Sequence, residues 1–326
     1  MHDFGYLRVA DADSALAALA GRPDARLVAG GTDLLNLLKD GVETPGLLVD
    51  INRLDLAGVH AGPAGLSIGA LARMSDVAAD AGVRAGYPVI VAALQRSASP
   101  QVRNAATVGG NLLQRTRCPY FRAEAPAPCN KRWPGSGCAA ADGDDRSSAI
   151  FGWSRRCVAT HPSDLAVALA ALDARVRLRS AHGERTLAVT DLYRPPDGEP
   201  ERDTALQGAE LITAIEVPPV PADVRAAYLK LTDRAAHDFA LVSCAVAVEA
   251  RDGRIATARV ALGGVAAGPW RLTAAERALP GVALSADRLL AALGPAFARA
   301  RPVRRNGFKV ELARRAVVRA LMVAGA

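Results

Sequence analysis

The sequence predicts an α+β protein, and three observations carry this prediction. Short apolar runs alternate with amphipathic helical patterns through the first 56 residues. After residue 210 several strand patterns follow one another, with a hairpin turn at Asp252-Gly253. Two helical patterns then close the chain. Its 326 residues are enough for two or three domains with a sizeable core.

Residues 1–56 predict a small α/β unit. Strands are expected at 6–10, 26–29 and 46–51. A helix at 14–20 would be capped by Asp13 or Ser14, since short polar side chains satisfy the first amides of a helix. A second helix, at 34–39, would be capped by Thr32 or Asp33 and closed by Gly41.

Residues 57–220 predict a second unit with an irregular insertion at 114–160. Strands are expected at 66–68, 175–180, 186–189 and 210–217. Helices are expected near 75–82, 87–98 and 165–172, and Ser163 would cap the last of them. Residues 99–101 are expected to form a loop. The insertion is rich in proline, glycine and charge, so we expect a bound group, more than a core of its own, to order it.

Residues 223–326 predict a third unit, after a boundary marked by Pro218, Pro219 and Pro221. Strands at 226–232, 241–250 and 254–263 form a three-stranded antiparallel sheet. Helices at 285–300 and 307–323 cover one of its faces, and Asn306 would cap the second helix.

Charge and hydropathy exclude several functions. The net charge of +7 comes with only 4% aromatic residues and no nucleic-acid-binding motif, so we expect no nucleic-acid partner. No apolar run approaches the ~18–20 residues of a membrane span. The N-terminus has no export signal, which predicts the cytoplasm unless a partner subunit with a twin-arginine signal carries the folded complex to the periplasm.

Four cysteines within 40 residues point to a metal site. Their spacing is Cys118-x10-Cys129-x8-Cys138-x18-Cys157, without the close pairs that zinc knuckles use. Widely spaced single cysteines on a Gly/Pro-rich loop suit a [4Fe–4S] cluster, and eight basic against four acidic residues in 114–160 suit its negative charge. Zinc, free thiols and disulfides are the alternatives. Cys244 lies in an apolar run and predicts a buried strand residue.

Two glycine pairs suggest a site for a phosphate group. Gly30-Gly31 lies between a predicted strand and a helix, where backbone amides can approach an anion. Gly109-Gly110 repeats the pattern 79 residues later, which suggests that a pyrophosphate is held between two lobes. The segment matches neither a Walker A loop nor a G-x-G-x-x-G motif, so an ordinary strand-to-helix turn is the alternative. Asp164 could bind a ribose or an adenine, or act as a first-turn helix residue.

The order of these motifs resembles the FAD-binding (medium) subunit of molybdenum hydroxylases, the group that contains xanthine dehydrogenase, carbon monoxide dehydrogenase and aldehyde oxidoreductases. The resemblance covers essentially the whole chain. The matching motifs are Val28–Leu35, Thr107–Asn111, Pro162–Asp164 and Tyr228-x-Lys230. The cysteine-bearing segments look like the [4Fe–4S]-containing flavin subunit of bacterial periplasmic aldehyde oxidoreductases; these segments are 111–121, 128–132, 134–138 and 157–164.

The resemblance implies a two-lobed FAD-binding domain of the PCMH type, followed by a domain like the C-terminal domain of the carbon monoxide dehydrogenase flavoprotein. FAD would lie between the first two units. Its pyrophosphate would be cradled by backbone amides of Arg26, Leu27, Val28, Ala29, Gly30, Gly31, Thr32, Asp33 and Leu34. Thr107, Gly110 and Asn111 would complete the cradle from the second lobe. Asp164 would hold the adenosine end, and Ile212 and Lys230 would lie near the isoalloxazine; for Lys230 the alternative is a solvated strand residue.

The resemblance further implies an electron-transfer subunit, and the chain shows no candidate for substrate chemistry of its own. A large partner with the molybdenum cofactor would oxidise an aldehyde. A small partner with [2Fe–2S] clusters would pass the electrons to this chain, and FAD would deliver them to an external acceptor. The alternatives are a flavin subunit of an enzyme like 4-hydroxybenzoyl-CoA reductase or xanthine dehydrogenase, a stand-alone FAD oxidoreductase, and a non-catalytic assembly module pinned by its metal.

Overall fold

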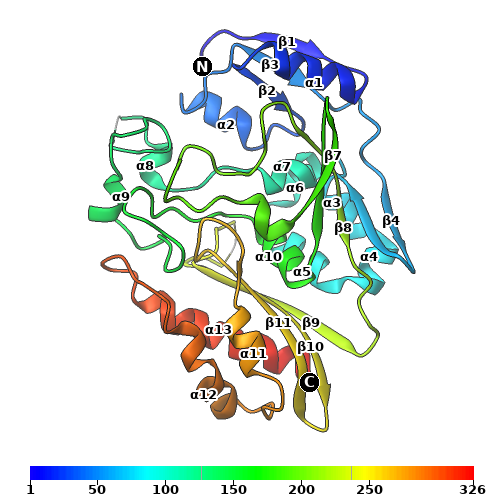
Figure 1. The fold of residues 1–326 in the computed structure, drawn as a ribbon, viewed down its shortest axis with the longest axis vertical. Helices are drawn as coiled ribbons and strands as arrows, with labels where there is room; N and C mark the ends of the chain where they lie inside the picture. The colour runs from blue at the N-terminus through cyan, green and yellow to red at the C-terminus, as the bar shows by residue number, and fades with distance from the viewer. Residues whose placement is uncertain (126, 236) are drawn as a thin grey trace.

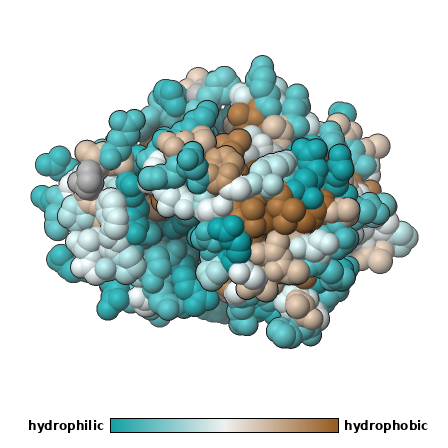
Figure 2. All heavy atoms as spheres, turned by 90° about the horizontal axis from the view of Figure 1, so that it is seen from above, coloured by the Kyte–Doolittle hydropathy of each residue, from teal (hydrophilic) through white to brown (hydrophobic). Residues whose placement is uncertain are grey.

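Residues 1–125, 127–235 and 237–326 are described by the computed structural model, which contains three β-sheets (Figure 1). The sheets are built from residues 5–50, 59–217 and 224–271. Each therefore falls within one predicted unit, while the limits 1–56, 57–220 and 223–326 stay predictions. No helix in the described ranges is long and apolar enough to cross a bilayer. Seen from the N-terminal end, the surface is mainly hydrophilic around a central hydrophobic patch (Figure 2).

The N-terminal sheet is parallel, in the order β1-β3-β2. Its elements are β1 (Gly5–Arg8), α1 (Ala12–Gly21), β2 (Ala25–Val28), α2 (Leu34–Lys39) and β3 (Leu47–Asp50). Both helix caps differ from the prediction. The side chain of Asp11 caps α1 by accepting from the Ser14 amide at 2.7 Å, because the helix begins earlier than expected. No side chain caps α2, since Asp33 bonds elsewhere.

The middle sheet is antiparallel, in the order β4-β5-β8-β6-β7. Its strands are β4 (Val59–Gly62), β5 (Gly65–Gly69), β6 (Arg175–Ser180), β7 (Gly183–Ala188) and β8 (Leu211–Val217). The helices of this part are α3 (Met74–Ala79), α4 (Ala81–Gly86), α5 (Pro88–Arg96), α6 (Pro100–Ala105), α7 (Val108–Leu112), α10 (Asp164–Ala171) and the 3₁₀ turn η1 (Val189–Leu192). Ser163 caps α10 as predicted, accepting from the Ala166 amide at 3.0 Å.

The C-terminal sheet has the three predicted strands and one short addition. The strands are β9 (Val224–Leu231), β10 (Val242–Arg251), β11 (Arg254–Gly263) and the two-residue β12 (Trp270–Arg271). On one face lie α11 (Thr273–Ala278), α12 (Ala286–Phe297) and α13 (Phe308–Gly325); α5 and α10 of the middle part pack on β9, β10 and β11 (Figure 1). The sheet is therefore enclosed by helices from two parts of the chain. Cys244 is fully buried on β10, as predicted.

The insertion at 114–160 contains two short helices, α8 (Pro119–Arg122) and α9 (Ala139–Asp142), between loops. The expectation that it packs little core is wrong. Phe121, Ile150 and Phe151 are almost fully buried, and the last two belong to the C-terminal core. The amides of Ile150 and Phe151 also bond the Val265 carbonyl at 2.9 and 3.0 Å. Hydrophobic packing against the C-terminal part thus orders the second half of the insertion.

Candidate functional site

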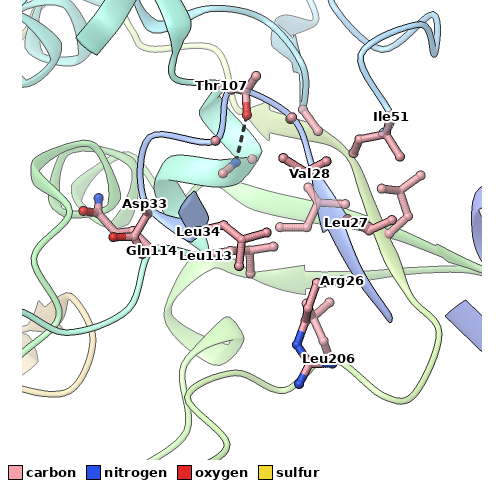
Figure 3. A pocket seen from close by; sticks show the side chains of 18 of the residues that line it. Arg26, Leu27, Val28, Asp33, Leu34, Ile51, Thr107, Leu113, Gln114 and Leu206 are labelled. Carbon is pink, nitrogen blue, oxygen red and sulfur yellow. Dashed lines mark hydrogen bonds between the residues drawn. The ribbon is translucent and has the colours of Figure 1, made fainter. Parts of the chain in front are cut away.

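A cavity of about 400 Å³ opens between the N-terminal and middle parts (Figure 3). Its wall is formed by residues 25–34 on one side, and by side chains from 107–115 and 206–212 on the other. In Figure 3, Leu27, Val28 and Ile51 lie on one side of the site, Thr107 above it and Arg26 below. The cavity therefore has apolar walls, while its edge carries charged side chains.

The glycine loop after β2 requires both of its glycines. A Cβ at Gly30 would lie 2.0 Å from the carbonyl oxygen of Ala105, so only glycine allows this close approach between lobes. Gly31 has φ +70° and a Cβ there would lie 2.8 Å from Leu35 Cδ1. This left-handed conformation favours glycine. The loop therefore differs from the alternative, an ordinary strand-to-helix turn with a side-chain cap, because no side chain caps α2.

Backbone amides distinguish the two glycine loops. Among the residues the structure describes, the amides of Gly31, Thr32 and Asp33 donate no hydrogen bond to another protein group. In the second loop the Gly110 amide donates to Thr107 Oγ1 at 3.2 Å, and the Asn111 amide donates to the Thr107 carbonyl at 2.8 Å. The first loop therefore offers free donors, whereas the second offers mainly the hydroxyl proton of Thr107.

Asp33 lies at the edge of the cavity as the centre of an ion cluster. It accepts hydrogen bonds from the Arg115 amide and from Arg122 Nη2, both at 2.8 Å, and from the Arg117 guanidinium. Burial would raise the pKa of Asp33, but the nearby charges of Arg117 and Arg122 outweigh burial and hold this pKa below its usual range. Sequence reasoning missed this role, although the Arg115-Thr116-Arg117 spacing beside the glycine motif was a signal.

The ion pair of Asp33 with Arg117 stands between two cavities. Asp33 lines the first cavity, and Arg117 lines a second one of about 210 Å³. Asp164 and Phe239 also line the second cavity, and the Arg117 guanidinium lies 4.8 Å from the centre of the Phe239 ring. The two cavities are thus neighbours, and the ion pair between Asp33 and Arg117 lies between them.

The structure brings most of the predicted FAD ligands together. Arg26–Leu34, Thr107, Gly110 and Ile212 all line the first cavity. Asn111 does not line it: its Oδ1 accepts from Ser163 Oγ at 2.6 Å, and so it connects the second loop to α10. Ile212 shares this cavity with the glycine loop, whereas Lys230 does not line it.

Asp164 and Lys230 form a buried ion pair of 2.8 Å, in which both side chains are at most 5% exposed. Tyr228 and Ser97 also donate to the Asp164 carboxylate. Burial raises the pKa of Asp164 despite these partners. This pairing corrects the expectation that the two residues hold opposite ends of one cofactor, and it excludes a solvated Lys230.

The four clustered cysteines meet at one small cavity. Cys118, Cys129, Cys138 and Cys157 line it together with Lys131, although 39 positions separate the first from the last. Cys129 and Cys138 pair across a short antiparallel bridge. The Cys157 thiol donates to Cys138, which lowers the pKa of Cys138 to about 6, while burial raises the pKa of Cys118 to about 11. In the described ranges, no group of three or more His, Cys, Asp or Glu side chains meets the geometry of a single metal ion.

Polar contacts fix the loop between Cys129 and Cys138. The Asn130 carboxamide oxygen accepts from the amides of Gly135 and Gly137, each at 3.0 Å. Lys131 Nζ reaches out of the loop to the Pro200 carbonyl at 2.7 Å and to Asp203. The positions of the thiols are therefore set by bonds within the loop and by bonds to the middle part.

Comparison with known proteins agrees with this architecture. Residues 2–220 match the family described as the FAD binding domain in molybdopterin dehydrogenase. Residues 227–324 match the CO dehydrogenase flavoprotein C-terminal domain. Among solved structures, a chain of the Cu,Mo-CO dehydrogenase has a TM-score of 0.78 at 26% identity, with 99% of this chain and 98% of that chain covered.

Two curated relatives are similar over most of their length. The chain is 46% identical to the aldehyde oxidoreductase FAD-binding subunit PaoB of Escherichia coli (strain K12), with 100% of this chain and 99% of that protein covered. It is 30% identical to the glyceraldehyde dehydrogenase medium chain of Sulfolobus acidocaldarius, with 87% and 84% covered. The chain therefore belongs to the FAD-binding subunits of the molybdenum hydroxylases, and it is an oxidoreductase subunit.

Proposed function

We propose that this chain is the FAD- and [4Fe–4S]-binding electron-transfer subunit of a molybdenum-dependent aldehyde oxidoreductase. One observation carries the proposal: a glycine loop with free amides and a cavity lined by four cysteines occur in the same chain. The similarity to an aldehyde oxidoreductase FAD-binding subunit, which extends over the full length of both, supports the choice of substrate class.

The first cavity fits the phosphates of FAD. The free amides of Gly31, Thr32 and Asp33 lie where the chain enters α2, and amides in this arrangement bind phosphate oxygens. Thr107, which is 2% exposed, would donate its hydroxyl proton from the opposite lobe. Gly110 would admit the phosphates beside it, and Asn111 would hold the second loop against Ser163.

The two cavities suggest how the rest of FAD is oriented. Ile212 and the apolar wall of the first cavity suit a flat ring, which we assign to the adenine. We assign the isoalloxazine to the side of Asp164 and Lys230, because Cys118 lines both the second cavity and the cysteine cavity. This orientation places the redox-active ring on the side of the thiols.

The convergence of the four cysteines supports a [4Fe–4S] cluster as the proposed group. Four single, widely spaced thiols line one cavity, and the corners of a cubane are wider apart than the ligands of one metal ion. Cys118, Cys129, Cys138 and Cys157 would be the ligands. Lys131, buried beside them, would offset part of the negative charge of the thiolates.

In this reading the chain binds and orients its cofactors and performs no proton chemistry on a substrate. Bound FAD would accept and release electrons, and the protein supplies orientation and charge. The ion pair of Lys230 with Asp164 holds both side chains in place at that end of the site. The Asp33–Arg117 pair fixes the loop that would carry the pyrophosphate.

The proposed partners are a large subunit with the molybdenum cofactor and a small subunit with [2Fe–2S] clusters, together with an external electron acceptor. The complex would lie in the cytoplasm, or in the periplasm by co-export with a partner that bears a twin-arginine signal. The domain limits 1–56, 57–220 and 223–326 belong to the same proposal.

The test is the visible spectrum of the purified full chain, with FAD and iron measured per chain. About one FAD and four irons are expected. A chain that stays colourless after anaerobic reconstitution with iron, sulfide and FAD would instead be an assembly module.

Coexpression with the partner subunits then decides the substrate class: oxidation of xanthine but not of aldehydes would favour the xanthine dehydrogenase-like alternative.

A further inference from the structure

An open cleft of about 590 Å³ lies beside the glycine loop and adjoins the first cavity. Ala29 and Gly30 line both this cleft and the first cavity. Arg8 and Asp50 end the parallel strands β1 and β3, so the cleft lies at the carboxyl edge of the N-terminal sheet. Open α/β sheets bind ligands at this edge, because the loops that follow the strands meet there.

Arg8, Arg53, Arg73 and the Asp50 carboxylate line the cleft. Both oxygens of the carboxylate already accept hydrogen bonds from other protein groups. Asp50 Oδ2 accepts from the Tyr6 hydroxyl and from Arg8 Nε. Asp50 Oδ1 accepts from the Asn52 amide at 2.9 Å and from Asn52 Nδ2 at 2.7 Å. Burial would raise the pKa of Asp50, but these hydrogen bonds outweigh burial and hold it well below its usual range. Asp50 and Arg8 therefore neutralise each other.

The other two arginines carry charge that no carboxylate offsets. Arg73 is half-buried, and its guanidinium donates to the Ala105 carbonyl and, at 2.9 Å, to Asn52 Oδ1. Arg53 is exposed, and across residues 1–125, 127–235 and 237–326 its side chain makes no hydrogen bond or ion pair. Asn104 adds an amide side chain to the same cleft. The cleft thus presents two positive charges and further donors.

The geometry points to a binding site for a small anion with phosphate or carboxylate groups, formed by Arg53 and Arg73 with Asn104 beside them. Guanidinium groups bind such oxyanions through paired N–H donors. Arg73 is preorganised, because its two neutral hydrogen bonds fix the side chain and leave other N–H groups free. Arg53 supplies the mobile second charge. None of the three arginines lines the first cavity, although the cleft and that cavity share Ala29 and Gly30.

The test is isothermal titration of the FAD-loaded full chain with pyrophosphate and, separately, with citrate. Saturable binding is expected at one site, and stronger binding of one anion identifies the phosphate or the carboxylate class. Flavin absorbance is followed in parallel, so that anion binding is distinguished from displacement of FAD at the glycine loop. Arg53→Gln and Arg73→Gln should each weaken binding about tenfold or more, because each removes charge-assisted hydrogen bonds.

Arg84→Gln is the matched control, because Arg84 is exposed on α4, outside the cleft. It should leave the affinity unchanged. Arg53→Gln removes no contact of the folded chain, so its result holds even if Arg73→Gln disturbs the Ala105 contact. Absence of binding, equal weakening in the Arg84 variant, or unchanged binding in the Arg53 variant would each overturn the inference.

Discussion

Asn306 donates a hydrogen bond from its side-chain amide to the Ser148 carbonyl at 3.0 Å, and so connects the C-terminal part to the cysteine insertion. The same amide reaches the Ala149 carbonyl at 3.2 Å, and Asn306 Oδ1 accepts from the Val303 amide at 2.7 Å. Lys309 donates to the Ser148 carbonyl as well, at 2.8 Å. Asn306 therefore does not cap the last helix, as its position suggested. It anchors the insertion.

Asn306→Ala should lower the free energy of unfolding by about 3 kcal/mol. The change leaves the Ala149 carbonyl and the Val303 amide without this partner, while the Ser148 carbonyl keeps its bond from Lys309, and each group that loses its partner costs roughly 1–3 kcal/mol. Chemical denaturation measures the loss, and limited proteolysis should show new cleavage within 142–151.

The control is Asn104→Ala, since Asn104 is exposed at the end of α6. It should change the unfolding free energy by less than about 0.5 kcal/mol. Equal stability of both variants would show that the anchor contributes little to the fold.

Most of the sheet strands were predictable because apolar alternation signals them directly. Strand β10 was identified as a short apolar run, and the turn at Asp252-Gly253 marked the start of β11. Helix α6 was missed because Ser99-Pro100 was read as a loop, although Ser99 caps the helix and Pro100 occupies its first turn. β12 was missed because its two residues pair only through tertiary contact.

The candidate site was predictable where glycine was required and unpredictable where partners come from far along the chain. Gly30 and Gly31 stood out in the sequence. The pairing of Asp164 with Lys230 joins residues 66 positions apart, so no local pattern reveals it. For the same reason Asp33 looked like a helix cap, whereas arginines of the insertion bind its carboxylate.

Gly31→Val and Gly110→Val should each abolish FAD binding. At Gly31 a β-branched side chain resists φ +70° and meets Leu35, which displaces the free amides. At Gly110, which lines the cavity, the new Cβ would lie 2.9 Å from Thr107 Oγ1, the hydroxyl group proposed to bind the phosphates. Flavin absorbance per purified chain is the measurement.

The matched controls are Gly281→Val and Gly294→Val. Gly281 has φ +81°, and neither position has an atom within 4 Å of a new Cβ, so these changes reproduce the backbone cost away from the cavity. Both should retain FAD. If the Gly31 and Gly110 variants retained as much FAD as these controls, the phosphates would have to bind elsewhere.

Cys118→Ser, Cys129→Ser, Cys138→Ser and Cys157→Ser should each lose most of the iron. Each removes one thiol from the cavity that all four line, and serine is a poor ligand for an iron–sulfur cluster. Iron per chain after anaerobic reconstitution is the measurement. Because Ile150 and Phe151 pack in the C-terminal core, proteolytic sensitivity should be confined to the first half of the insertion.

Cys244→Ser is the control for the cysteine series, since Cys244 is fully buried on β10, far along the chain from the other four. It should keep its iron and lose about 1–3 kcal/mol of stability, because it buries a hydroxyl. Four irons in any of the four ligand variants, or their loss in this control, would mean that the ligand set is wrong.

His161→Phe should make the chain less sensitive to acid. Burial lowers the pKa of His161 to about 3, and its Nε2 has no partner among the described residues. Below about pH 6.5 the unfolded chain binds a proton that the folded chain does not, so stability falls with pH down to about 3. Phenylalanine keeps the packing against Tyr193, whose ring centre lies 4.4 Å away.

Chemical denaturation at pH 7 and pH 5 measures how much free energy of unfolding is lost between the two pH values. This loss should be about 2 kcal/mol smaller in the variant than in the wild-type chain. The exposed His182→Phe change should leave that loss as it is, and equal losses in all three chains would contradict the assignment of acid sensitivity to His161.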